Sequence, residues 1–359
     1  MRFYLIGAGV ISKTHADTIR KIAAEETVEI KVADPNPQAL AGFAEKYPEA
    51  KTYSDAKEML EEKAREDDIV IVCTPPSTHF SLSLLALKSG RNALCEKPFV
   101  MTLEQSEQLL EAAKENHRLV GCCSVRFIGT PKTEEVRKYI ESGQLGEVYK
   151  VTFVFRNQRG RPGVEYQPES RWFLDRSKAG GGILMDWGPY DISVLNDLFK
   201  PTSVEVSAAW MSKPVTEVDP VDVVYDVEGH VGAMLKYKLE GSKQLWVQYE
   251  RAACTHGEAY RHVEIEGTLG AIKWSPYFDS DEVLYKSDSN GQVAENAQSL
   301  PNTGNFGFMD NPVYFFYKRV TGQPSPAVVN EQAVFNFSCM QAIYDCADSG
   351  LPQQIIRKV

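Results

Sequence analysis

The sequence lacks the features of a membrane protein, a nucleic-acid-binding protein and a disulfide-stabilised protein. Its apolar runs are short, and one of the purest, Ile69–Cys73, is far below the ~20 residues of a membrane-spanning helix. Acidic residues outnumber basic ones, 49 to 39, so there is no excess positive charge to bind phosphate backbones or anionic lipids. The seven cysteines are an odd set without C-x-x-C spacing. These absences predict no metal site, no nucleic-acid or membrane partner, and reduced thiols in a cytoplasmic protein.

The sequence does have the length and composition of a two-domain globular protein. Its 359 residues exceed the size of one ordinary domain, which is about 100–200 residues. Apolar residues make up 43% of the chain and charged residues 25%, which is enough apolar content for two buried cores. We place the domains at residues 1–124 and 125–359, because the pattern of predicted elements changes there.

Short apolar strands alternate with helical stretches in residues 1–124. The predicted strands are Phe3–Ile6, Val28–Ala33, Ile69–Cys73, Asn92–Cys95 and Leu119–Ser124. The predicted helices are Ile11–Ala24, Pro37–Lys46, Asp55–Lys63, His79–Ser89 and Thr102–Asn116, the last capped by Thr102. Strands separated by helices of this length are typical of βαβ units and a parallel sheet. The first domain is therefore predicted to be a doubly wound α/β nucleotide-binding domain.

Residues 125–359 are richer in strands. A helix over Thr133–Ser142 precedes an extended segment, Glu147–Arg156. The further predicted strands are Ser203–Met211, Val221–Glu228, Val231–Leu239, Gln244–Arg251, His262–Glu266 and Ala271–Trp274. Glycine-containing junctions between several of them favour a mainly antiparallel sheet. We expect Asp279–Gly304 to be a polar surface excursion, and Glu331–Ala347 to be a closing helix.

The first strand is followed by a glycine-containing turn, Gly7-Ala8-Gly9-Val10-Ile11-Ser12. Gly7 permits a tight turn, and Gly9 lets backbone N–H groups approach a pyrophosphate at the start of the next helix. Ser12 stands where the dinucleotide fingerprint often has its third glycine. The turn and its neighbours Val10 and Ile11 are therefore candidates for cofactor binding, and an ordinary strand–helix turn is the alternative.

Asp34 ends the second predicted strand, where a carboxylate can accept hydrogen bonds from adenosine ribose hydroxyls. Its neighbours Pro35 and Asn36 offer no positive charge to a 2′-phosphate. NAD is therefore favoured over NADP. The alternative is that Asp34 only starts the turn at Pro35.

Two further loops follow strands of the first sheet. Thr74-Pro75-Pro76 follows Ile69–Cys73, and Glu96-Lys97-Pro98 follows Asn92–Cys95. The carboxyl ends of parallel strands face the ligand crevice, so both loops are candidates for the cofactor site. His79 opens the helix after the first loop, either as a structural residue or near the cofactor.

These motifs together resemble the glucose–fructose oxidoreductase/inositol dehydrogenase/MocA superfamily. The resemblance rests on the Gly-Ala-Gly turn with His15 downstream, Asp34, the two loops, the run Gly180–Tyr190 (GGGILMDWGPY) and Glu266–Gly270 (EGTLG), in the expected order along nearly the whole chain. It implies an N-terminal Rossmann domain and a C-terminal α+β domain with an open-faced, mainly antiparallel sheet. It also implies NAD-dependent oxidoreductase activity, with Glu96 and Lys97 near the cofactor.

The resemblance also implies catalytic residues. Most members carry a histidine as proposed acid/base where this chain has Tyr190, as in a minority of the family. Asp186 and Tyr190 are four residues apart and share a face of a helix. Lys97 would bind the reacting oxygen and lower the phenol's pKa while Tyr190 exchanges the proton, or Lys97 would itself carry the proton. Asp186 would bind a substrate hydroxyl or cap the helix.

Other candidate substrate contacts are less specific. Many relatives have Trp-Arg where this chain has Trp172-Phe173. Tyr166 and Trp172 are candidates for an aromatic platform under a sugar ring, core packing being the alternative for Trp172, and Arg126 is a further candidate substrate contact. Arg156, Arg159 and Arg161 form a basic stretch, either a clamp for an anionic substrate group or a solvated loop or subunit contact.

The sequence thus predicts an NAD-dependent dehydrogenase of a sugar, inositol or related polyol. A redox-neutral glycosidase with tightly held NAD and a non-catalytic sugar- or nucleotide-sensing regulator are the alternatives. An open sheet face must be covered, so we expect a homodimer or homotetramer. The candidate residues for this face are Val204, Val206, Leu235, Trp246 and Val247.

Overall fold

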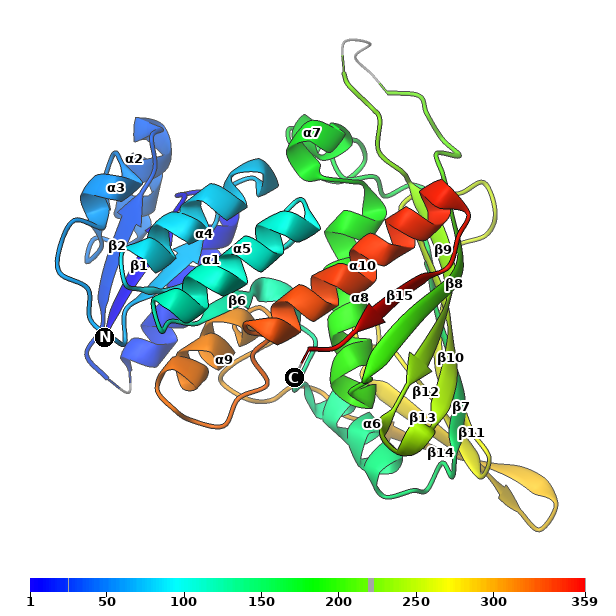
Figure 1. The fold of residues 1–359 in the computed structure, drawn as a ribbon. Coiled ribbons are helices and arrows are strands. Elements are labelled where there is room, and N and C mark those ends of the chain that lie inside the picture. Colours follow the sequence, from blue (N-terminus) through cyan, green and yellow to red (C-terminus); the bar gives the residue numbers. More distant parts are fainter. Residues whose placement is uncertain (25, 219–222, 359) are drawn as a thin grey trace. The chain divides into compact units, whose positions relative to one another are not determined.

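The computed structural model describes residues 1–24, 26–218 and 223–358, which fall into two units (Figure 1). Unit 1 contains a six-stranded parallel sheet in the order β3-β2-β1-β4-β5-β6. Its strands are β1 (Arg2–Ile6), β2 (Glu29–Ala33), β3 (Lys51–Tyr53), β4 (Ile69–Val72), β5 (Asn92–Cys95) and β6 (Val120–Cys122). Every residue of β1, β4 and β5 is buried, as expected of parallel strands covered on both faces. The strand order reverses between β1 and β4, the place where doubly wound sheets bind ligands.

The helices of unit 1 mostly match the prediction. They are α1 (Val10–Ala23), α2 (Pro37–Lys46), α3 (Ala56–Met59), α4 (His79–Lys88) and α5 (Leu103–Glu115), with one-turn 3₁₀ helices η1 (Pro76–Thr78) and η2 (Cys123–Val125). The Thr102 side chain accepts a hydrogen bond from the Gln105 N–H, which confirms the predicted cap. The prediction for Asp55–Lys63 was too long. The Arg91 guanidinium bonds to the carbonyls of Leu60 and Glu62, so these groups are not available to continue α3.

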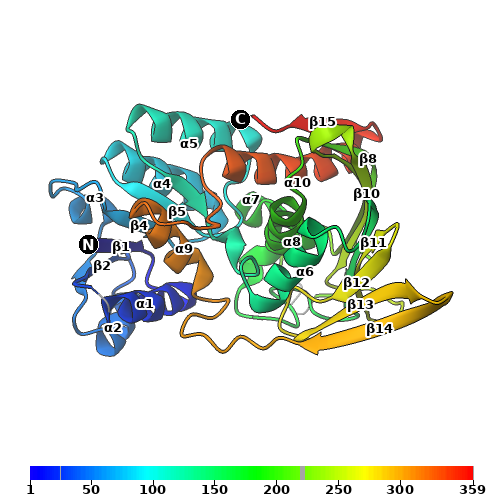
Figure 2. The same ribbon diagram turned by 90° about the horizontal axis from the view of Figure 1, so that it is seen from below.

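Unit 2 is built on a nine-stranded sheet in the order β14-β13-β12-β11-β7-β10-β9-β8-β15. The strands are β7 (Val148–Arg156), β8 (Ser203–Ser212), β9 (His230–Lys238), β10 (Gln244–Ala252), β11 (Tyr260–Gly267), β12 (Gly270–Trp274), β13 (Glu282–Ser289), β14 (Gln292–Ser299) and β15 (Gln353–Ile356). Within this nine-stranded sheet, β7–β10 is the only parallel pair among the described strands, and the other pairs are antiparallel. Helices α6 (Pro131–Glu141), α8 (Ile183–Phe199) and the later part of α10 (Glu331–Ser349) lie on one face of this sheet (Figures 1 and 2). The mainly antiparallel sheet with one helix-covered face confirms the predicted fold class.

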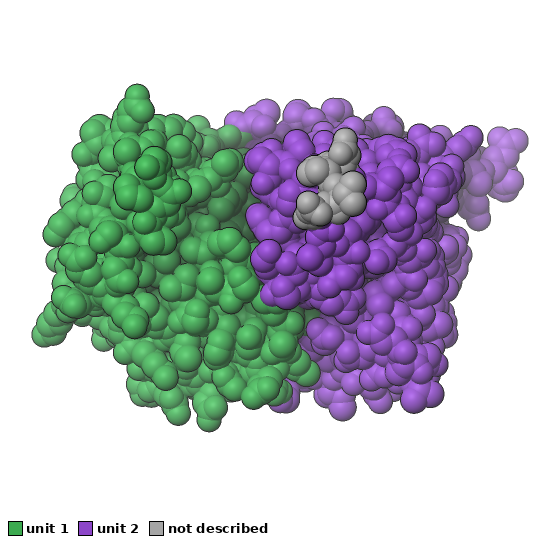
Figure 3. Space-filling model, turned by 90° about the horizontal axis from the view of Figure 1, so that it is seen from above, with its two compact units in different colours: residues 1–126, 304–337 green, residues 127–303, 338–359 purple. Residues whose placement is uncertain are grey.

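The division into units differs from the predicted boundary at residue 124. Unit 1 comprises Met1–Arg126 and Gly304–Phe337, and unit 2 comprises Phe127–Thr303 and Ser338–Val359 (Figure 3). Residues 304–337 return to unit 1 because α9 (Asn311–Val320) packs on its core, where Phe316 is 1% exposed. A β-carbon on Gly121 would lie 2.7 Å from the Phe316 ring, so the helix and β6 fit closely.

The segment Asp279–Gly304 is largely exposed, as expected of a surface excursion, but it contains the β13–β14 hairpin, which the sequence analysis did not identify. Nearly all of β14 is exposed, so its sequence carries no apolar alternation. The turn did carry a signal. Asn290 and Gly291 both have positive φ, 52° and 75°, and Asn-Gly is the preferred pair for a two-residue hairpin turn.

The described part of the predicted strand Val221–Glu228 is not a strand in the structure. Residues 221 and 222 lie outside the described residues, and residues 223–228 form no strand. Their backbone groups bond elsewhere: the Asp226 N–H donates to the Leu174 carbonyl, and the Glu228 carbonyl accepts from the Ile183 N–H. The segment therefore supports the start of α8 instead of extending the sheet.

The residues predicted for the open sheet face divide between its two faces. Val204, Val206, Leu235 and Val247 are buried, at most 1% exposed, and form part of the core of unit 2. Trp246 points to the other face and is 43% exposed. The period of two along β10 accounts for the difference, because Trp246 pairs with Lys236 and Val247 with Leu235. All seven cysteines are buried and free of disulfides, and no helix among the described residues could cross a lipid bilayer.

Candidate active site

The turn after β1 requires glycine at its first position. Gly7 has φ of +102°, and a β-carbon there would lie 2.7 Å from the carbonyl oxygen of Cys73 at the end of β4. Both features exclude a side chain. Its N–H donates to the carbonyl of Ala33, which ties the turn to the end of β2 at 2.8 Å. The backbone therefore turns sharply after β1, in close contact with the ends of the neighbouring strands β2 and β4.

The next residues leave the start of α1 open. Gly9 is the N-cap, no side chain caps the helix, and a β-carbon on Gly9 would meet nothing within 4 Å. Val10 is 83% exposed and Ile11 is half-buried, although both are apolar. Ser12 replaces the third glycine of the fingerprint and is buried, its hydroxyl donating to the Gly9 carbonyl at 2.8 Å. The free helix terminus and the missing side chain fit a bound pyrophosphate.

Asp34 lies beside this turn. Its Oδ2 accepts a hydrogen bond from the Ala8 N–H and its Oδ1 from the Asn36 N–H, both at 2.8 Å. A carboxylate has further lone pairs, so it can still accept from ribose hydroxyls. The structure thus brings together the predicted glycine turn and the predicted ribose-binding carboxylate.

The two loops after β4 and β5 are joined by His79, the first residue of α4. His79 is 1% exposed, with Nδ1 2.7 Å from the Pro98 carbonyl oxygen and Nε2 2.8 Å from the Thr74 carbonyl oxygen. Burial lowers the pKa of its imidazole, against the opposing effect of the two carbonyls. Pro75 is exposed and Pro76 is buried. Of the two roles considered for His79, the geometry favours the structural one.

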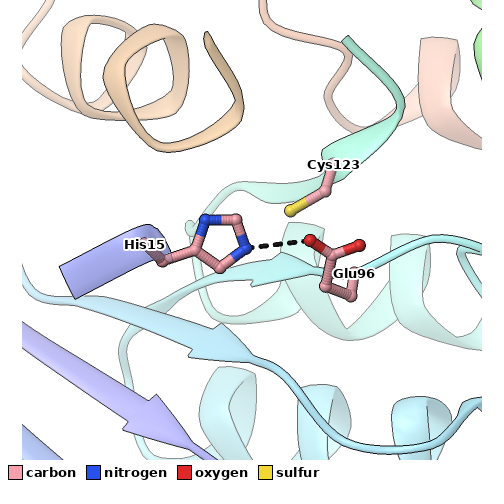
Figure 4. A group of neighbouring side chains, drawn as sticks. All are labelled: His15, Glu96 and Cys123. Atoms are coloured by element: carbon pink, nitrogen blue, oxygen red, sulfur yellow. Dashed lines mark hydrogen bonds and ion pairs between the residues drawn. The ribbon is translucent and has the colours of Figure 1, made fainter. Parts of the chain in front are cut away.

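Glu96 is buried in a polar cluster (Figure 4). Its Oε1 bonds to His15 Nε2 at 2.8 Å and Arg126 Nη2 at 3.2 Å, and its Oε2 accepts from the Lys97 N–H at 3.0 Å. Burial alone would raise the pKa of Glu96, but Arg126 and His15 hold it well below its usual value. With these contacts and 5% exposure, Glu96 supports neighbouring residues and presents little surface to a cofactor.

One ligand atom each from His15, Glu96 and Cys123 lies within 4.8 Å of the others. Figure 4 shows these three side chains. Such a group has the right donor types for a transition metal. The Arg126 guanidinium, however, already neutralises Glu96 and would repel a cation. We therefore interpret the cluster as a hydrogen-bonded support for the Lys97 backbone.

Lys97 is partly exposed, although every residue from Arg91 to Val100 except Lys97 is buried. Its backbone N–H is bonded to Glu96, and the next carbonyl, that of Pro98, is bonded to His79. Arg126, a predicted substrate contact, is an ion-pair partner of Glu96 with a side chain 14% exposed. The predicted lysine is thus the one residue of the segment 91–100 that is not fully buried.

In unit 2, Asp186 and Tyr190 lie one turn apart on α8, as predicted. Asp186 is 9% exposed and Tyr190 3% exposed. The Tyr190 ring contacts Phe127 edge-on, with ring centroids 5.3 Å apart, and Trp187 at 5.8 Å. Tyr190 is therefore packed in a cluster with these two aromatic rings, which also stack on each other.

The sequence analysis did not identify the ion pair between Asp191 of α8 and Arg251 of β10. Asp191 is fully buried and accepts hydrogen bonds from Arg251 Nε at 3.0 Å and the Tyr249 hydroxyl at 2.8 Å. Tyr277 also donates to it. The Arg251 guanidinium lies over the Trp187 ring, 4.9 Å from its centroid. The signal was a carboxylate in an otherwise apolar helical run, which requires a buried partner.

A second missed residue, Glu228, caps α8. Its Oε2 accepts from the Gly182 N–H at 2.9 Å, and its Oε1 accepts from the Leu184 N–H and the Tyr344 hydroxyl. A β-carbon on Gly182 would lie 1.9 Å from the Glu228 carbonyl oxygen. A negative charge at the N-terminus of a helix also interacts favourably with the helix dipole. The last two glycines before α8 therefore allow close packing, Gly182 against Glu228 and Gly181 against Tyr344.

The remaining predicted contacts lie in the loops of unit 2. Trp172 stacks on Phe173, with ring centroids 3.9 Å apart, and Tyr166 is 56% exposed. The basic stretch is neutralised within this unit: Arg161 is buried and paired with Glu165, Arg159 pairs with Glu165 and Glu217, and Arg156 lies near Glu250. The structure favours a structural role for these arginines over an anion clamp.

Family models match both parts of the chain. The model described as an oxidoreductase family with an NAD-binding Rossmann fold matches residues 1–123, and the GFO/IDH/MocA C-terminal domain model matches residues 133–273. Together they cover well over half of the sequence. The chain belongs to the GFO/IDH/MocA oxidoreductase family. This confirms the predicted superfamily, the oxidoreductase class and the NAD-binding domain.

Two relatives within this family illustrate the similarity. D-glucoside 3-dehydrogenase from Escherichia coli K12 is 26% identical over 98% of this chain and 96% of its own length. Inositol 2-dehydrogenase from Rhizobium meliloti is 29% identical over 76% of this chain and 74% of its own length. Among solved structures, levoglucosan dehydrogenase in complex with NADH and levoglucosan has a TM-score of 0.78 at 20% identity, with both chains fully covered. The last comparison shows a shared fold.

Proposed function

We propose that this protein is an NAD-dependent dehydrogenase that oxidises a secondary alcohol or lactol of a sugar, inositol or related polyol. The observation that carries the proposal is the open glycine turn with Asp34 beside it, in a chain whose relatives are named glucoside and inositol dehydrogenases. The alternatives, a redox-neutral glycosidase and a sensory regulator, are not favoured by these comparisons.

The residues of unit 1 fit NAD. The backbone around Gly9 and the start of α1 would hold the pyrophosphate, and Asp34 would accept from the adenosine ribose. The Asp34 carboxylate would repel a 2′-phosphate, which favours NAD over NADP. The loop Thr74–Pro76, at the carboxyl end of β4, would face the nicotinamide half. Bound NAD⁺ supplies the hydride acceptor.

The chain's own residues would move the proton. A tyrosine is protonated at neutral pH, since its free pKa is about 10, so oxidation of an alcohol requires a nearby cation to stabilise the phenolate. We assign that cation to Lys97 and the proton-accepting oxygen to Tyr190. Lys97 as proton carrier is the alternative. Asp186 would accept a hydrogen bond from a substrate hydroxyl and so orient the reacting carbon.

Sugar recognition is assigned to aromatic and polar groups. Tyr166 and Trp172 would provide apolar surface for a sugar ring, and the exposure of Tyr166 supports this. Arg126 remains a candidate substrate contact, with a guanidinium that is paired with Glu96 and a side chain that is 14% exposed. Neutral sugars are favoured as substrates, because the three arginines of the basic stretch are already paired.

We also propose a homodimer or homotetramer formed through the sheet face opposite α8 and α10. Trp210, Met234 and Trp246 lie on that face of β8, β9 and β10, and each is more than a third exposed. The Trp210 indole lies over Gly232. Exposed tryptophans on a sheet face are typical of interfaces. Replacing both tryptophans by glutamate should give a monomer in light scattering, whereas unchanged mass would contradict this assembly.

The function is tested with a panel of aldoses, inositols, uronates and glycosides, each incubated with NAD⁺ or NADP⁺ while NADH or NADPH formation is followed. Steady NADH formation with one substrate class is expected. No NADH, with NAD still bound to the purified protein, would instead indicate the redox-neutral glycosidase. No NADH and no affinity for NAD would contradict the whole proposal.

A further inference from the structure

The Lys97 turn is held at both ends by buried side chains. On its N-terminal side, Glu96 accepts the Lys97 N–H and is itself fixed by His15 and Arg126. On its C-terminal side, the Pro98 carbonyl lies 2.7 Å from His79 Nδ1. The backbone on both sides of Lys97 is therefore fixed, while the lysine side chain is partly exposed.

His79 also contacts the neighbouring loop. Its other ring nitrogen lies 2.8 Å from the Thr74 carbonyl oxygen, so one imidazole contacts the loops after β4 and β5. Because both partners are acceptors, the neutral ring donates a hydrogen bond to one of them at a time, and only the imidazolium donates to both. These strands are adjacent and parallel, with Val72 opposite Cys95. Because α4 begins at His79, the position of the ring is set by the helix as well as by both carbonyls. The bridge therefore links the Lys97 turn to the Thr74–Pro76 loop.

We propose that His79 is a positioning residue for Lys97, and that its bond to the Pro98 carbonyl fixes the direction in which the lysine side chain leaves the turn. This inference rests on the proposed function, in which Lys97 binds the reacting oxygen. His79 is 1% exposed and both of its ring nitrogens lie against backbone carbonyls, so it offers little surface to a substrate or cofactor. A reactive group displaced by about 1 Å can lose about 10²-fold in rate, so a flexible turn should lower kcat.

The two bonds of His79 can be removed separately. In His79→Asn the amide nitrogen lies near the position of Nδ1 and can keep the Pro98 bond. In His79→Gln it lies near Nε2 and can keep only the Thr74 bond. We expect His79→Gln to lower kcat by about 10- to 100-fold, with little change in KM for NAD⁺. His79→Asn should retain kcat within about threefold and raise KM for NAD⁺, because the cofactor loop is released.

A matched control is available on the same strand. Asn92 is buried at the opposite end of β5, where its side chain bonds to the Glu66 and Asp68 carbonyls and to the Leu119 N–H. Asn92→Ala should lower the melting temperature of the protein as much as the His79 variants do, and leave kcat unchanged. Loss of kcat in Asn92→Ala equal to that in His79→Gln would overturn the proposal, because it would trace the effect to general destabilisation.

Amide hydrogen exchange supplies a readout independent of activity. In His79→Gln, exchange at the Lys97 and Phe99 amides should become at least about tenfold faster, whereas Asn92→Ala should leave it unchanged. Unchanged exchange, or unchanged kcat in an active enzyme, would overturn the positioning role. If the wild-type protein forms no NADH from any sugar, the proposed function fails, and the exchange rates alone then decide whether His79 holds the turn.

Discussion

At the scale of single residues, the account depends on side chains placed by their neighbours. Tyr190 packs against Phe127 and Trp187, Asp34 accepts a hydrogen bond from the glycine turn, and Lys97 lies in a turn whose backbone is held by hydrogen bonds. The sequence could indicate these three residues, because each stands at a recognisable position after a strand or in a motif. It could not indicate Arg251 or Glu228, since their partners lie far away in the chain.

Replacement of Tyr190 by phenylalanine tests the proton transfer. Tyr190→Phe keeps the ring contacts and removes only the hydroxyl, so NADH binding measured by fluorescence should be unchanged. We expect kcat to fall by about 10²–10⁴-fold, the usual contribution of a general acid or base. The matched control is Tyr260→Phe, on an exposed tyrosine of β11 outside the proposed site, which should leave kcat nearly unchanged. Near-normal turnover in Tyr190→Phe would remove this residue from the mechanism.

Replacement of Asp34 by asparagine tests cofactor choice. The amide oxygen can still accept from the Ala8 N–H, whereas the amide nitrogen cannot accept from the Asn36 N–H, so the contact to the glycine turn is kept while the negative charge is lost. Loss of a charged hydrogen bond, worth about 1.5–3 kcal/mol, should raise KM for NAD⁺ by about 10- to 100-fold. The KM for NADP⁺ should fall, because repulsion of the 2′-phosphate is removed. Equal changes for both cofactors would show that Asp34 only supports the turn.

At the scale of elements, helix α8 is positioned by charges that its amphipathic pattern does not reveal. Glu228 caps its start, and the Asp191–Arg251 pair anchors its middle to β10. Helix and strand positions with clear periodicity were predictable, as α5 and its Thr102 cap show. The β13–β14 hairpin and α3 were not, because exposed strands lack alternation and a tertiary contact from Arg91 ends the helix.

Breaking the Asp191–Arg251 pair should destabilise unit 2. Arg251→Met keeps most of the side-chain volume but leaves Asp191 buried without its cationic partner. The expected loss is about 3–5 kcal/mol in the free energy of unfolding, measured by urea denaturation. Arg159→Met, which removes an exposed arginine, should cause little change. Equal stability of Arg251→Met and the wild type would show that the pair contributes no net stabilisation.

At the scale of the whole molecule, the sequence predicted two domains but not that a late segment of the chain belongs to the first one. Residues 304–337 join unit 1, because α9 carries apolar residues that fit its core beside Gly121. A single sequence does not show such a return, since local patterns in a helix do not specify which core it covers. Contacts between residues far apart in the chain also make stability depend on pH. The Glu96 carboxylate, for example, is stabilised in its ionised form by His15 and Arg126.

Acid should destabilise the protein partly through Glu96. Its pKa is held below the unfolded value of 4.5, so its contribution to stability is present above that value and is lost as the pH falls toward the folded pKa. Urea denaturation between about pH 6 and pH 3 should show this loss. In Glu96→Gln, the decline should be shallower, because no carboxylate titrates at this position. An identical pH slope in both proteins would contradict the ion pairing of Glu96.

The central claim is hydride transfer from a sugar or polyol carbon to NAD⁺. The most direct measurement uses the substrate found in the panel, labelled with deuterium at each carbinol carbon in turn, and mass spectrometry of the NADH formed. The account predicts that one labelled position transfers its deuterium to NADH, and that Tyr190→Phe slows this transfer without abolishing NAD binding. NADH without deuterium from any position, or product formed with deuterium retained in the sugar and no net NADH, would contradict it.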